Sequence, residues 1–161
     1  MGKTHIVAEP GLPFVDITRE FDAPRELLFR AHTEPDLLVQ WLGPRKYRMT
    51  IDRFEARDGG TYRYVHSDDD GNEYGFHGVF HGSQTIDGMT QTFEFEGAPG
   101  HVSLGTVTFE DIGDGRSRAL VHSVYQSVQD RDAVVESGMG EGMSEGYRRL
   151  DELLGKLVPV A

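Results

Sequence analysis

The feature that most constrains the fold is a separation of strand patterns from helical patterns along the chain. Between residues 47 and 126, short runs of alternating apolar and polar residues are divided by turn signals such as Asp58-Gly59-Gly60 and Gly113-Asp114-Gly115. One earlier strand is predicted over residues 14–21, two short helices follow it, and a long helix is predicted from about residue 130 to 156. Strands segregated from helices predict an α+β fold with an antiparallel sheet of about six to seven strands.

The length of the chain predicts one domain. A chain of 161 residues can bury one sizeable core. Residues 1–13 contain Gly and Pro but no periodic pattern, so we expect a flexible N-terminal tail, followed by a single domain over residues 14–158.

Charge and composition exclude several classes of function. The net charge is −11 and the basic residues form no stripe, which argues against binding to nucleic acid or to anionic membranes. No apolar run reaches the roughly 20 residues of a membrane span, so we expect no membrane insertion. The N-terminus has no apolar secretion signal and the chain has no cysteine, so we expect a cytoplasmic protein.

The terminal helix carries glycines on one strip of its apolar half. At 100° per residue, Gly138, Gly142 and Gly146 lie close together, and Met139, Met143 and Tyr147 lie beside them. Two explanations fit this pattern. The strip either lets another backbone element approach the helix closely, or it leaves room for a ligand beside adaptable methionine side chains.

Several motifs resemble one known family over residues 14–156. They are Trp41-Leu42-Gly43-Pro44, Arg57-Asp58-Gly59-Gly60-Thr61-Tyr62, the stretch Tyr74 to Phe80, and the terminal Arg131 to Leu153 pattern. Together they resemble the activator-of-heat-shock-protein-90-ATPase homologue family of the SRPBCC superfamily. The resemblance implies a START-like helix-grip fold, in which a curved sheet wraps around a long C-terminal helix and encloses a cavity. It therefore favours the second explanation, in which the glycine strip leaves room for a ligand, and it implies binding of a small hydrophobic molecule.

The expected lining of that cavity is aromatic and methionine-rich. The candidate ligand-binding residues are Trp41, Tyr62, Tyr64, Phe76, Phe93, Phe95, Met139, Met143 and Tyr147. Each of them could equally be an ordinary core residue. His66 shares the phase of Tyr62 and Tyr64, and His122 could also point inward, so these two histidines are the candidate polar groups of the pocket.

We expect neither a metal nor a cofactor, and no catalytic residue is assigned. His77 and His81 lie on one strand face but about 13 Å apart, which is too far to share an ion. No serine has a nucleophile setting. The superfamily nevertheless contains polyketide cyclases and aromatases, so an enzyme using pocket Tyr and His is the alternative.

Protein partners are a further alternative. The chain leaves no room for the additional N-terminal domain of the eukaryotic co-chaperone, which argues against a chaperone partner. A homodimer through a sheet edge or the outer face is compatible with the sequence.

Overall fold

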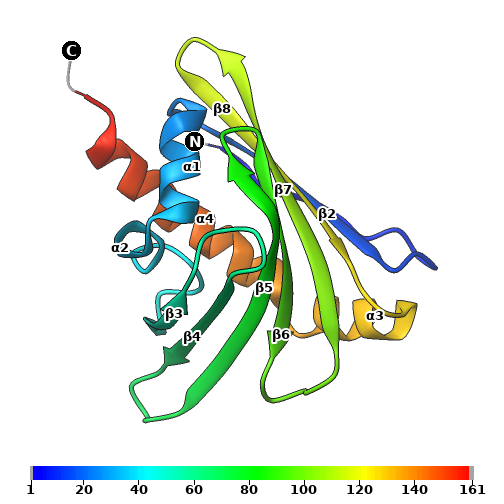
Figure 1. Ribbon diagram of the computed structural model, residues 1–161. Coiled ribbons are helices and arrows are strands. Elements are labelled where there is room, and N and C mark those ends of the chain that lie inside the picture. Colours follow the sequence, from blue (N-terminus) through cyan, green and yellow to red (C-terminus); the bar gives the residue numbers. More distant parts are fainter. Residues whose placement is uncertain (1, 160–161) are drawn as a thin grey trace.

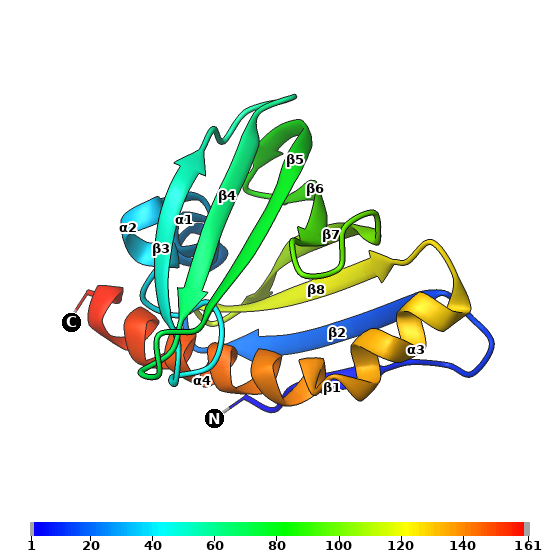
Figure 2. The same ribbon diagram turned by 90° about the horizontal axis from the view of Figure 1, so that it is seen from below.

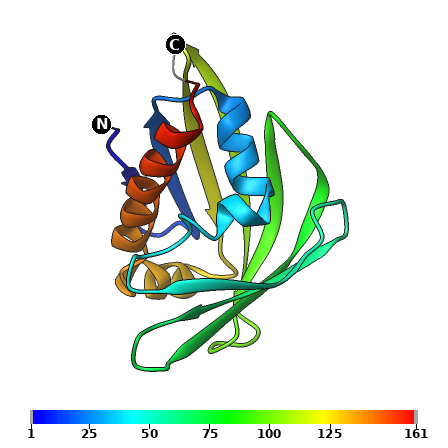
Figure 3. The ribbon, with the colours of Figure 1, turned by 90° about the vertical axis from the view of Figure 1, so that its left-hand side faces the viewer.

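One antiparallel sheet curves around a helical layer in the computed structural model, which describes residues 2–159 (Figure 1). The elements in chain order are β1 (His5–Val7), β2 (Phe14–Phe21), α1 (Arg25–Thr33), α2 (Pro35–Leu38), β3 (Arg48–Phe54), β4 (Thr61–Ser67), β5 (Glu73–Thr85), β6 (Gly88–Phe95), β7 (Val102–Gly113), β8 (Arg116–Val124), α3 (Val128–Glu136) and α4 (Met139–Leu157). The spatial strand order is β1-β2-β8-β7-β6-β5-β4-β3. Helices α1, α2 and α4 lie on the concave side of this sheet (Figure 3).

This architecture confirms the predicted α+β helix-grip fold, with two short helices after an early strand. The sheet has eight strands, against the expected six to seven. The additional strand is β1, which lies inside the segment expected to be a flexible tail. Its residues pair with β2 in the register His5 to Thr18 and Val7 to Asp16, so this part of the tail is an ordered edge strand.

The predicted terminal helix is interrupted, which corrects the helical wheel. Helix α3 ends at Glu136 and α4 begins at Met139, because Gly138 has a φ of 91°. This left-handed conformation is costly for residues with a Cβ atom and readily adopted by glycine. Gly138 therefore separates two helices, which lie end to end in Figure 2, and does not belong to the glycine strip.

The core forms where period-two strands meet one face of α4. Val15, Ile17, Arg19 and Phe21 alternate along β2 and are all buried. On the helical side, α4 buries Tyr147, Leu150, Leu153 and Leu154. Figure 2 shows α4 running alongside β2, across the concave side of the sheet.

The glycines of α4 accommodate a neighbouring backbone segment. A Cβ atom at Gly146 would lie 3.3 Å from the backbone oxygen of Trp41 and 3.3 Å from the backbone nitrogen of Gly43. A Cβ atom at Gly142 would meet Pro44 at 3.7 Å. The glycine strip thus faces the loop after α2. Gly142 and Gly146 allow the backbone of this loop to lie close to α4, and they do not leave room for a ligand.

No helix among residues 2–159 combines the length and the apolar character needed to cross a bilayer.

Candidate functional site

The inner face of β4, β5 and β6 carries a continuous group of rings, which we call the inner aromatic cluster: Tyr64, His66, Phe76, Phe93 and Phe95. Register places Tyr64 opposite Phe76, and Phe76 opposite Phe95. The centroid of the Phe76 ring lies 5.1 Å from Tyr64, 5.4 Å from His66, 5.3 Å from Phe93 and 5.2 Å from Phe95. Alternating strand positions therefore build one apolar surface around Phe76.

This cluster runs from the packed core to solvent. Tyr64 and His66 are buried, Phe76 and Phe95 are half-buried, and Phe93 is 36% exposed. Along the same inner face, Gly105 on β7 pairs with Gln91 and with Ser123, and all three are only half-buried. The middle of the concave face is consequently a half-buried strip next to the buried core. We call it the inner groove and define it by Phe76, Phe93, Phe95, Gln91, Gly105 and Ser123.

His66 brings a polar atom to the buried end of the cluster. Its side chain is 7% exposed, and its Nε2 atom has no hydrogen-bond partner among the described residues. The Tyr47 ring stacks on it at 5.5 Å with an interplanar angle of 12°. Burial lowers the pKa of His66 to about 4, and the nearby Arg149 charge adds to this effect. The imidazole is therefore neutral at pH 7.

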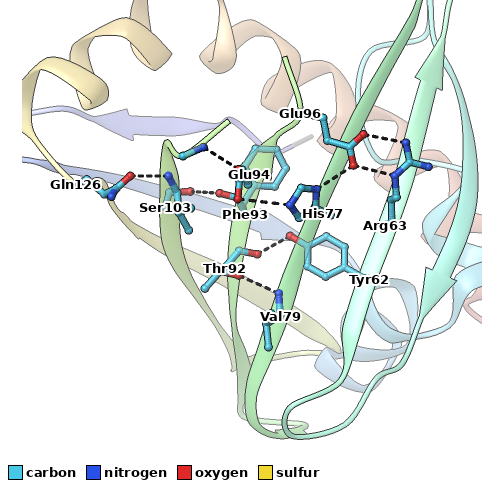
Figure 4. Close-up of polar contacts among 12 residues, drawn as sticks. Tyr62, Arg63, His77, Val79, Thr92, Phe93, Glu94, Glu96, Ser103 and Gln126 are labelled. Carbon is cyan, nitrogen blue, oxygen red and sulfur yellow. Dashed lines mark hydrogen bonds and ion pairs between the residues drawn. The ribbon is translucent and has the colours of Figure 1, made fainter. Parts of the chain in front are cut away.

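Three of the predicted ligand-binding residues lie in the packed core with their polar atoms already satisfied or enclosed. Trp41 is 3% exposed and its Nε1 donates to the Ala31 carbonyl at 2.9 Å. Tyr62 is 3% exposed and its hydroxyl donates to the Thr92 carbonyl at 2.6 Å (Figure 4). Tyr147 is fully buried between Phe21 and Trp41. These three side chains belong to the buried core next to the inner aromatic cluster and are not part of the inner groove.

The two predicted methionines lie at the start of α4. Met139 and Met143 are half-buried and pack against the core. They share a helix face with Tyr147, because residues four apart lie on one side of a helix. Tyr147 faces the sheet, so the two methionines extend the same apolar face toward the first turns of α4.

His122 is not a pocket residue. Its Nδ1 lies 2.6 Å from a carboxylate oxygen of Asp16, and the side chain is on the outer face of the sheet. The Tyr62 hydroxyl is bonded to the Thr92 carbonyl and His122 faces outward, so these two side chains do not meet in a polar cluster on the inner face. Of the two candidate histidines, only His66 lies on the inner face.

The outer face of β4, β5 and β6 carries an ionic network that sequence reasoning did not predict. Arg63 donates to Glu96 from Nε and Nη2 at 2.8 Å each, and His77 Nδ1 lies 2.9 Å from Glu96 (Figure 4). These contacts, chiefly that of Arg63, lower the pKa of Glu96 to about 2. His77 therefore faces outward and contributes to a surface network.

Two surface hollows are present elsewhere. One of about 500 Å³ lies beside β3 and includes Arg45, Arg48 and Arg149, and one of about 290 Å³ lies between Pro10 and α3. Neither is lined by the predicted ligand-binding residues. The strand edge and the helix surface that form the first hollow are far apart in sequence, which is why no local motif signals it. Residues 2–159 contain no group of three or more acidic or histidine side chains placed to hold a metal ion.

Comparisons with known proteins agree with this fold. The sequence profile of the family described as "Activator of Hsp90 ATPase homolog 1-like protein" matches residues 22–155. A crystal structure of a Rhodobacter sphaeroides protein is similar with a TM-score of 0.86 at 29% identity, covering 96% of this chain and 99% of that one. Protein Ms6760 from Mycobacterium smegmatis has a TM-score of 0.84 at 24% identity, covering 97% and 100%. The AHSA1 protein from Silicibacter pomeroyi has a TM-score of 0.74 at 19% identity, covering 90% and 99%. Comparison with curated proteins gives no match.

Proposed function

The chain belongs to the family of Activator of Hsp90 ATPase homolog 1-like proteins, and from this premise we propose that it binds a small hydrophobic molecule in the inner groove. Proteins of this fold family commonly bind hydrophobic ligands. The ligand would lie on the concave face of β5 to β8, beside the first turns of α4. It would be a neutral, ring-containing molecule, because the surface offered to it consists of stacked rings.

The observation that carries this proposal is the partial exposure of large rings on the concave side of the sheet. Phe93 is 36% exposed, and Phe76 and Phe95 are half-buried, although all three stack on one another or on their neighbours. Covering such a surface releases about 25 cal/mol per Å² of apolar area. A flat apolar ligand would gain this free energy and add an offset-stacked contact.

His66 supplies the polar anchor in this proposal. Its ring faces the Leu42 carbonyl, and Nε2 is left without a partner. A neutral ring that donates from Nδ1 to that carbonyl presents Nε2 as an acceptor. A ligand hydroxyl or N–H group would therefore satisfy this nitrogen, which favours a hydrophobic molecule with one donor over a pure hydrocarbon.

Binding can be tested with the neutral fluorescent probe N-phenyl-1-naphthylamine, which carries aromatic rings and one N–H donor. The blocking variant is Gly105→Leu, because a Cβ atom there meets only Ser123 Oγ at 3.6 Å and the Gln91 oxygen at 3.9 Å. The larger side chain would then extend into the groove without a steric clash at the backbone. The matched control is Thr108→Leu, at an exposed position on the opposite face of the same strand.

We expect saturable probe fluorescence with the wild-type protein and with Thr108→Leu, and at least a tenfold weaker affinity with Gly105→Leu. Circular dichroism and thermal unfolding establish that both variants are folded. Equal affinities of the two variants would place the probe outside the groove and contradict the proposal. Absence of saturable binding to the wild-type protein would contradict it as well.

A further inference from the structure

We propose that the hollow beside β3 is a second ligand site, which binds a small organic anion carrying a carboxylate or a phosphate monoester. The hollow has a volume of about 500 Å³, and its polar lining comprises Arg45, Arg48, Arg149, Tyr47, Thr50 and Ser67. Its walls come from the edge strand β3, the end of β4, and the helical layer. This site is separate from the inner groove and does not depend on the function proposed for it.

Charge is the first observation that supports an anion. The chain has a net charge of −11, yet three arginines border this one hollow. Most arginines of the protein are paired with a carboxylate, but among residues 2–159 no carboxylate forms an ion pair with Arg48 or Arg149. The Arg149 side chain donates from Nη1 to the Gly43 carbonyl at 2.8 Å, its one hydrogen bond among the described residues. Two of the three arginines at the hollow, Arg48 and Arg149, therefore carry charge without an ion-pair partner among the described residues.

The two glutamates near the hollow make their direct contacts with one arginine, Arg45. Glu152 pairs with Arg45 at 2.6 Å, and Glu145 accepts the backbone N–H of Arg45 at 2.6 Å. These contacts hold Arg45 in place at the rim of the hollow. Burial and the Arg45 charge lower the pKa of Arg149, although Glu145 and Glu152 oppose this shift. An anion bound between Arg48 and Arg149 would offset the burial of the Arg149 charge and its repulsion by Arg45.

The remaining lining residues favour an organic anion over an inorganic ion. Thr50 and Ser67 contribute hydroxyl groups that can donate to an oxyanion. Val39 and Met49 contribute an apolar wall, and Tyr47 contributes a ring. Tyr47 also stacks on His66, so this ring separates the hollow from the buried end of the inner aromatic cluster. The lining thus has a polar part and an apolar part, which match a ligand with one anionic end and one aromatic or aliphatic end.

The test compares two double variants of equal net charge. Arg48→Gln/Arg149→Gln removes the two arginines without carboxylate partners from the hollow. Arg53→Gln/Arg148→Gln removes one arginine from the same strand and one from the same helix, neither of which lines the hollow. Amide NMR titrations use phenyl phosphate, benzoate, inorganic phosphate and neutral benzyl alcohol as separate probes.

We expect saturable shifts of amides in residues 45–50 with phenyl phosphate or benzoate, and the stronger of the two identifies the preferred anionic group. The affinity should fall at least tenfold in Arg48→Gln/Arg149→Gln and stay near the wild-type value in the control. The single variant Arg48→Gln, at an exposed position where the side chain makes no hydrogen bond to another described residue, provides the same comparison if the double variant unfolds. Equal affinities in the two double variants, or equal binding of inorganic phosphate or benzyl alcohol, would overturn the assignment. So would the absence of saturable shifts with both organic anions.

Discussion

His66 is a buried side chain of the inner face with one ring nitrogen, Nε2, that has no hydrogen-bond partner among the described residues. Trp41, Tyr62 and Ser117 each donate to a backbone carbonyl, as buried donors usually do. A buried polar atom without a partner costs about 1–3 kcal/mol of stability. In the proposed function, a ligand hydroxyl or N–H group would offset this cost by donating to Nε2.

His66 and the half-buried His32 predict a decline in stability in mild acid. Burial lowers the pKa of His32 and of His66 to about 4, whereas an unfolded histidine titrates near 6.5. Between these values the unfolded chain binds more protons than the native one, so the free energy of unfolding should fall as the pH drops from 6.5 to 4. Urea unfolding across this range measures the slope.

Replacing His66 isolates its share of that slope. In His66→Phe the free energy of unfolding should change less steeply between pH 6.5 and 4, because one of the two titrating groups is gone. The control variant His81→Gln removes an exposed histidine from the surface instead. If His66→Phe has the wild-type slope, His66 does not resist protonation in the native state.

Among the elements, α4 shows that glycines in one helix serve different purposes. A Cβ atom at Gly146 would lie 3.3 Å from two backbone atoms of the Trp41–Gly43 segment, whereas one at Gly155 would meet nothing within 4 Å. Gly155→Ala should therefore stabilise the protein by about 0.5–1 kcal/mol through helix propensity alone. Gly146→Ala should be destabilising, because its added methyl group displaces the loop backbone. Urea unfolding of the two variants measures both effects, and equal stabilisation would show that the close approach at Gly146 is unimportant.

Across the whole molecule, the sequence predicted what depends on periodicity and missed what depends on long-range contact. Alternation located the strands, and the motif resemblance indicated the grip of sheet around helix. The division at Gly138 was missed because a helical wheel assumes continuity, although an αL glycine at a helix boundary is a recognisable signal. Strand β1 was missed because three residues show no period and gain their order from pairing with β2. The outward direction of His122 and the carbonyl partner of Tyr62 depend on strand register, which the sequence left open.

The same long-range character applies to the contact that joins the sheet to the helical layer. Arg19 on β2 is 2% exposed and forms two hydrogen bonds with Asp151 on α4, at 2.6 and 3.1 Å. Asp151→Asn should destabilise the protein by about 2–4 kcal/mol, because it leaves a buried guanidinium without its counter-charge. Arg19→Met/Asp151→Asn should recover part of this loss, since removing both charges also removes the unpaired one. The exposed-pair variant Glu34→Gln is the control and should cost less than about 0.5 kcal/mol. Denaturant unfolding measures the free energy of unfolding of all three variants. A double variant no more stable than Asp151→Asn would mean that the unpaired Arg19 charge is not the cause of the loss.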